Sequence, residues 1–118
     1  SVPVSRVAAF IEASTADTHA IQPDVRICAF GHLGDGNIHY NYSLPAASSP
    51  GDFRPELSEA VYDRLTEMGG SFAAEHGLGF SKAPIADKRR SATERDLMRS
   101  LRGVFNPDDV LNPSVSVD

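Results

Sequence analysis

The sequence predicts an α+β fold of the split βαβ, or ferredoxin-like, kind: an antiparallel sheet with helices on one face, then a C-terminal helix and an extended tail. Three observations predict it. Two β-rich segments flank a glycine-rich turn at residues 34–36, two other segments carry apolar residues at helical spacing, and the elements follow the order β-α-β-β-α-β.

The expected elements can be given in chain order. They are an edge strand at 1–4, a helix at 5–21, strands at 25–33 and 38–44, a surface loop at 45–55, a helix at 56–68, a short strand at 71–74, a glycine-bearing loop at 75–84, a helix at 92–104 and an extended tail from 105. Ser5 is a typical helix N-cap, and Gly69-Gly70 is a typical helix stop. Leu97 and Leu101 fall on the face of the last helix that is expected to point inward.

The stretch Gly34-Asp35-Gly36 predicts a hairpin. Asp35-Gly36 suits a two-residue type I′ turn, which would place His32 directly opposite His39 with Cβ atoms about 4.5–5.5 Å apart. The predicted polar face carries Phe30, His32, His39, Asn41 and Ser43, and the predicted core face carries Ile27, Ala29, Leu33, Ile38, Tyr40 and Tyr42.

Two facing imidazoles can share one metal ion, but two ligands are too few for a typical site. The segment Glu75-His76-Gly77 offers a third. Adjacent residues of an extended segment point to opposite sides, so one side chain could complete the metal shell while the other reaches a substrate. Three alternatives stay open: a histidine pair that is incidental surface, an Asp35 that serves the turn alone, and a Glu75-His76 segment that is an ordinary polar loop.

Composition narrows the class of function. The net charge is −5, from 11 basic and 16 acidic residues, so nucleic acid is not an expected partner. The single cysteine, Cys28, is expected to be a small buried residue in a strand. It also excludes an internal disulfide and predicts a reducing, cytoplasmic compartment, with peripheral attachment to a membrane as the alternative. The chain opens at Ser1 without Met, as a piece of a longer protein would.

Three sets of residues taken together resemble a known family. They are Gly31-His32-x-Gly34-Asp35-Gly36-Asn37-x-His39-x-Asn41, Glu75-His76-Gly77-x-Gly79-x-x-Lys82, and Leu111-Asn112-Pro113. The sequence resembles the C-terminal part of the FAD-linked oxidases of the vanillyl-alcohol-oxidase fold, which include D-lactate dehydrogenases, the glycolate oxidase flavin subunit and D-2-hydroxyglutarate dehydrogenase.

The resemblance implies a role for several residues. His32, His39 and Glu75 would hold a divalent metal, usually zinc, Asn41 would contact the substrate, and His76 would contact the substrate and act as general base. Asn112 would touch the FAD cofactor. Lys82 matches the family pattern but has no implied role.

The implied chemistry is oxidation of a small 2-hydroxy acid. The substrate would chelate the metal through its carboxylate and hydroxyl, a neutral imidazole would take the hydroxyl proton, and the C2 hydride would pass to flavin N5. Residues 1–90 would belong to the substrate-binding cap domain, and residues 91–118 would return to an N-terminal FAD-binding domain that this chain lacks. We therefore expect the 118-residue chain alone to bind no FAD and to be inactive.

Two other classes remain open. The chain could be a stand-alone metal- or small-acid-binding module without catalysis, or a structural interaction domain in which the histidines have no function. Metal content separates the last reading from the other two. The electron acceptor and the oligomeric state are not indicated by the sequence.

Overall fold

The computed structural model describes residues 1–44, 46 and 53–113. The chain forms two compact units, unit 1 at Ser1–Ala74 and unit 2 at Glu75–Asp118. The predicted division of a longer protein's domains at residue 90 is a different boundary, which no observation tests, and it stays a prediction. No helix in the described part of the chain is both long and apolar enough to cross a membrane.

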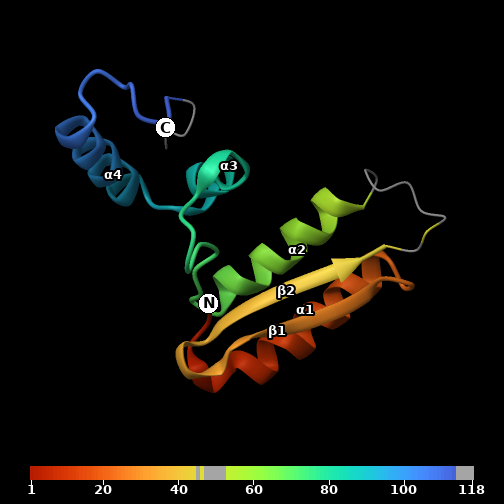
Figure 1. Ribbon diagram of the computed structural model, residues 1–118. Helices are drawn as coiled ribbons and strands as arrows, with labels where there is room; N and C mark the ends of the chain where they lie inside the picture. Colours follow the sequence, from red (N-terminus) through yellow and green to blue (C-terminus); the bar gives the residue numbers. More distant parts are fainter. Residues whose placement is uncertain (45, 47–52, 114–118) are drawn as a thin grey trace. The chain divides into compact units, whose positions relative to one another are not determined.

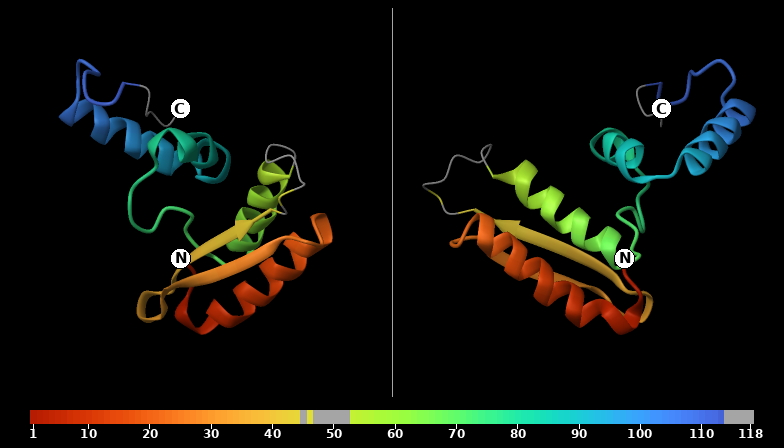
Figure 2. Two further views of the ribbon diagram at one scale, coloured as in Figure 1. Left: turned by 45° about the vertical axis from the view of Figure 1, so that its right-hand side comes forward. Right: turned by 180° about the vertical axis from the view of Figure 1, so that it is seen from behind.

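Unit 1 is built from two α-helices, two short 3₁₀ helices and one hairpin (Figure 1). In chain order its elements are η1 (Val4–Arg6), α1 (Val7–Ile21), β1 (Arg26–His32), η2 (Leu33–Asp35), β2 (Asn37–Ser43) and α2 (Arg54–Glu67). β1 and β2 pair antiparallel in a two-stranded sheet, and α1 runs along the hairpin in all three views (Figures 1 and 2). The α+β class is therefore confirmed.

The core of unit 1 lies between the two long helices and the core face of β2. Val7 and Phe10 from α1 and Val61 and Leu65 from α2 are buried together with Val2. Ile38 and Tyr40 of β2 pack against this cluster, and the Tyr40 ring meets the Phe10 ring edge to face with centroids 6.0 Å apart. These β2 residues belong to the core face that the alternation predicts, so the opposite face is left for polar side chains.

An ion pair joins the two helices at the edge of this core. Arg64 of α2 donates to both carboxylate oxygens of Asp17 of α1, at 2.9 and 3.1 Å. The hydrogen bond and the charge of Asp17 raise the pKa of Arg64. This bidentate contact fixes the relative orientation of α1 and α2.

The four-stranded arrangement of a split βαβ fold is not confirmed. Residues 1–4 and 71–74 are not strands, contrary to prediction. They are joined by backbone hydrogen bonds, including Ser71 N–H to the Ser1 carbonyl at 2.8 Å, but they form no ladder with the hairpin. Pro3 lacks an N–H, and the chain turns into η1 at Val4, so a strand cannot continue there.

Two helix boundaries of unit 1 need comment. Ser5 lies inside η1 and caps nothing, because α1 begins at Val7 and has no side-chain cap. The end of α2 agrees with prediction: the helix stops at Glu67, and Gly69 takes a left-handed φ of 68°. Of the predicted 45–55 loop, residues 45 and 47–52 lie outside the described residues, and Arg54 already belongs to α2.

Unit 2 contains α3 (Gly79–Arg89) and α4 (Ala92–Phe105). The loop predicted for 75–84 is wrong from Gly79 onward, where α3 begins and continues through Pro84. α4 is the expected third helix, and it begins with a capping box of Ser91 and Glu94. The hydrogen bonds from the backbone and side chain of Ser91, and then from Arg90, lower the pKa of Glu94.

The predicted inward face of α4 is exposed in the described chain. Leu97 and Leu101 are 59% and 60% exposed, since a unit of two helices has no sheet to cover this face. The predicted extended tail is also wrong for the residues described: the Asn106 side chain accepts from Leu111 N–H at 3.0 Å and donates to its carbonyl at 2.9 Å. These bonds close residues 106–111 into a turn, and residues 114–118 lie outside the described residues.

Candidate functional site

The hairpin turn differs from the predicted type I′ turn. Four residues, Leu33 to Gly36, connect the strands through η2, and Gly36 alone of these has a left-handed φ, at 69°. A type I′ turn needs a positive φ at both Asp35 and Gly36. The Gly36 carbonyl also accepts from Val2 N–H at 2.9 Å, a contact with the distant N-terminal segment.

The longer turn shifts the register by two residues. His32 lies opposite Asn37, and His39 lies opposite Phe30, so the predicted direct pairing of the two histidines is wrong. A shift of two preserves which side chains share a face, because the side-chain period of a strand is two. The predicted faces therefore hold within the strands, while Leu33 moves into the turn.

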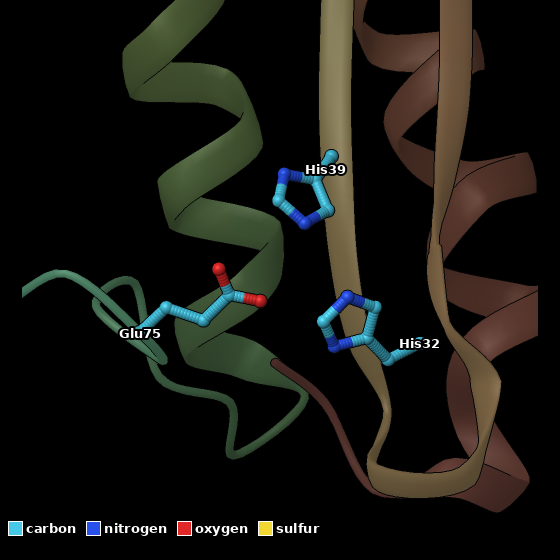
Figure 3. Close-up of side chains that lie close together, drawn as sticks. All are labelled: His32, His39 and Glu75. Atoms are coloured by element: carbon cyan, nitrogen blue, oxygen red, sulfur yellow. The ribbon is translucent and has the colours of Figure 1, made fainter.

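The two histidines are diagonal neighbours on the polar face. Their ring centroids are 5.7 Å apart, and the ring planes are inclined by 59°. In Figure 3 a nitrogen of each ring points toward the other ring. Diagonal positions are within reach of long and aromatic side chains, so both imidazoles can still approach one ion.

Each histidine has another side chain beside it. The His39 ring stacks on Phe30, with centroids 5.1 Å apart and planes 7° apart. His32 Nδ1 lies 3.9 Å from Asp35 Oδ2, and Asp35 Oδ1 accepts from Asn37 N–H at 3.1 Å. From the sequence alone, Asp35 had no predicted role besides the turn, and the stacking of His39 on Phe30 was not predicted. The only signal for Asp35 was its spacing of three residues from His32.

Glu75 is the third candidate ligand. It directly follows Ala74, the last residue of unit 1. One ligand atom each from His32, His39 and Glu75 lie within 4.8 Å of one another, and Figure 3 shows the carboxylate beside the two rings. Ligand atoms around a tetrahedral zinc are about 3.3 Å apart, from bond lengths of about 2.0–2.1 Å. The limit of 4.8 Å is wider than this spacing, so the side chains would move closer together to bind one ion.

The donor set fits a divalent cation. Two imidazoles and one carboxylate form a common zinc ligand set, and three protein ligands leave a coordination position for substrate or water. Among the described residues, this is the group of metal-ligating side chains close enough together to share an ion.

His76 turns toward Glu75 instead of away from it. Its Nε2 lies 3.0 Å from Glu75 Oε2, and its side chain is 89% exposed. The expectation that the two adjacent side chains point to opposite sides is wrong, because the backbone bends at residues 74–76 and Gly77 takes a left-handed φ of 71°. The His76 imidazole therefore lies beside the Glu75 carboxylate and is exposed to solvent.

The remaining predicted residues lie in three other places. Asn41 is exposed on the polar face of β2, opposite Cys28, which is exposed rather than buried because it shares that face. Lys82 lies in α3. Asn112 has a left-handed φ of 49°, and its carbonyl accepts from Arg102 at 2.9 Å.

Known proteins similar to this chain place it in a family. A family model described as FAD linked oxidases, C-terminal domain, matches residues 1–115. D-2-hydroxyglutarate dehydrogenase of Xanthomonas citri pv. viticola is 38% identical over 116 residues, and that of Stutzerimonas stutzeri is 34% identical over 116 residues; each match covers 96% of this chain and 25% of the relative. Glycolate oxidase subunit GlcD of Bacillus subtilis is 33% identical over 114 residues, which cover 96% of this chain and 24% of the relative.

The chain thus spans about a quarter of the length of these relatives. The family match extends over both units and over every motif residue from Gly31 to Pro113. The chain belongs to the family of FAD-linked oxidase C-terminal domains.

Proposed function

We propose that this chain is the substrate-side part of an FAD-linked oxidoreductase that oxidises a small 2-hydroxy acid of the D-lactate, glycolate or D-2-hydroxyglutarate type. Membership of the family and the names of the similar proteins support the reaction class. The observation that carries the proposal is the gathering of His32, His39 and Glu75 ligand atoms within 4.8 Å of one another.

The three ligands would hold a divalent cation, with zinc as the expected metal because two imidazoles and a carboxylate form a common catalytic zinc ligand set. Such a cation, when bound, supplies a Lewis acid that lowers the pKa of a coordinated hydroxyl. His39 enters this arrangement with its ring held against Phe30, so part of its orientation is set before any ligand binds. Three protein ligands would leave a coordination position for the substrate.

His76 and Asn41 would act on the substrate. His76 is the proposed general base: a neutral imidazole is well matched to accept the hydroxyl proton near pH 7, and its exposure leaves it accessible. Asn41 stands on the same face of the hairpin as His39 and can donate to, or accept from, the substrate's polar groups. Both residues would orient the C2–H bond for transfer.

The cofactor would be FAD, held mainly by an N-terminal domain outside this chain. Flavin supplies the hydride acceptor when bound. Asn112 is the proposed contact of this chain with the cofactor, and the exposed apolar side chains of α4, among them Leu97 and Leu101, suit a helix that another domain covers. On this proposal the 118 residues alone bind no FAD and are inactive.

The test uses the whole protein that contains this chain, purified with its flavin. Anaerobic addition of D-2-hydroxyglutarate, D-lactate or glycolate should bleach the flavin absorbance with at least one of the three acids. His76→Gln should slow that bleaching while leaving bound zinc unchanged. Flavin that none of the three acids reduces, or a His76→Gln variant that reduces at the native rate, would overturn the proposal.

A second candidate is a metal- or small-acid-binding module without catalysis. One observation favours it: the ligand triad is formed by residues of this chain. Titration calorimetry of the zinc-loaded chain with D-lactate separates the two, because a binding module would hold the acid tightly without any flavin domain.

A further inference from the structure

We propose that Asp35 is a positioning residue: its carboxylate fixes the ring of His32 so that Nδ1 faces Asp35 and Nε2 is presented to the metal. This inference rests on the proposed metal site. It assigns Asp35 a task beyond the turn chemistry that its position in the hairpin already explains.

The two oxygens of Asp35 face different groups. Oδ1 accepts from the backbone N–H of Asn37 at 3.1 Å, which holds the carboxylate across the turn. Oδ2 lies 3.9 Å from Nδ1 of His32. Because the first contact is to the backbone, the turn helps to hold the second oxygen beside the imidazole.

Asp35 does not act as a metal ligand in this arrangement. The group of ligand atoms within 4.8 Å of one another comprises His32, His39 and Glu75 and does not include Asp35. A separation of 3.9 Å is longer than a hydrogen bond, so at that distance the carboxylate would act on His32 through its charge.

A carboxylate beside Nδ1 selects one tautomer of a neutral imidazole. The proton goes to Nδ1, where it faces the negative charge, and Nε2 is left as the lone-pair donor. Figure 3 shows a nitrogen of His32 pointing toward the His39 ring, which is the direction that a shared ion would require. Metal-binding histidines commonly give their second N–H to such a carboxylate.

The experiment compares Asp35→Asn with Asp35→Ala in the chain. Asparagine keeps an oxygen that can accept from Asn37 N–H but lacks the charge, whereas alanine lacks both. Asp24→Asn, in the exposed turn before β1, is the matched control. Long-range ¹H–¹⁵N spectra, recorded where His32 is neutral, report its tautomer, and hydrogen exchange at the Asn37 amide reports the turn.

We expect the native chain to hold His32 mainly in the Nδ1–H form, and Asp35→Asn to lose that preference while Asn37 stays protected. Zinc affinity should fall about 10- to 100-fold in Asp35→Asn. An unchanged tautomer and unchanged zinc affinity in Asp35→Asn would overturn the inference. If the native chain binds no zinc but shows the Asp35-dependent tautomer, the proposed metal site fails while the positioning of His32 stands.

Discussion

Phe30 lies directly opposite His39 across the hairpin, and the two rings stack with centroids 5.1 Å apart and planes inclined by 7°. The pair exists because the four-residue turn shifts the register by two from the pairing that a type I′ turn would give. An apolar ring thus covers one side of the imidazole, and Figure 3 shows one nitrogen of His39 pointing toward His32.

Loss of this stacking should weaken metal binding. Aromatic pairs contribute about 0.5–1.5 kcal/mol, so Phe30→Ala should lower zinc affinity about 2- to 10-fold, while Phe30→Tyr should keep it. Phe80→Ala, which removes an exposed ring of α3, is the control. Competition titration with a zinc-binding dye measures the effect, and equal affinity in Phe30→Ala and Phe80→Ala would show that the stacking does not orient His39.

The hairpin turn should require glycine at position 36 but not at position 34. Gly36 has a φ of 69°, and a Cβ there would collide with the Val2 carbonyl, whereas a Cβ at Gly34 would meet no atom within 4 Å. Gly36→Ala should lower the free energy of unfolding by about 1–2 kcal/mol from the left-handed backbone alone, and Gly34→Ala should change it little. Urea denaturation compares the two, and equal stability of both variants would contradict this account of the turn.

The stability of the first turn of α4 should depend on pH through the protonation of Glu94. Its folded pKa is lowered, first by the hydrogen bond from the Ser91 backbone, so its stabilising effect is complete above the ordinary value of 4.5 and is lost as the pH falls through the lower folded value. The protection factor of the Ser91 amide, which compares its exchange rate with the intrinsic rate at the same pH, should therefore fall on acidification in the native chain. Glu94→Gln should have a lower protection factor at neutral pH and change less with acid, and identical pH profiles of the protection factor would refute the link.

The turn after α4 should depend on Asn106. Its side chain is buried and holds both the N–H and the carbonyl of Leu111. Asn106→Ala should remove the hydrogen-exchange protection of the Leu111 amide, because that amide loses its acceptor, and Asp108→Ala should leave it in place. Retained protection in Asn106→Ala would mean that Arg102, which also donates to the Leu111 carbonyl, holds the turn without Asn106.

The hairpin shows what the sequence could predict and what it could not. The two faces followed from the alternation of side chains, which depends only on whether a register shift is odd or even. The register depends on the turn, and the turn includes a hydrogen bond from Val2, a residue far away in sequence, to Gly36. A contact between residues so far apart in the sequence cannot be predicted from local sequence patterns. The sequence pointed to His32 and His39 as a pair and, through the family resemblance, to Glu75 as their partner, but it did not indicate the stacking of Phe30 on His39.

The errors outside the hairpin have local causes. α3 was missed because Gly77, Gly79 and Pro84 are all typical helix breakers, and here the glycines precede or begin the helix while Pro84 lies within it. The expected edge strand failed because Pro3 is followed by η1. In the 106–113 tail, the side chain of Asn106 closes a turn that looks extended in a sequence containing two Asn-Pro pairs.

The central claim is that His32, His39 and Glu75 form one divalent-metal site, and elemental analysis of the chain after zinc loading and gel filtration tests it most directly. We predict about one zinc per chain in the native protein and in His19→Ala, a histidine of α1 outside the ligand group. His32→Ala, His39→Ala and Glu75→Gln should each lose the ion. A native chain that retains no zinc, or any of the three variants that retains it fully, would contradict the account.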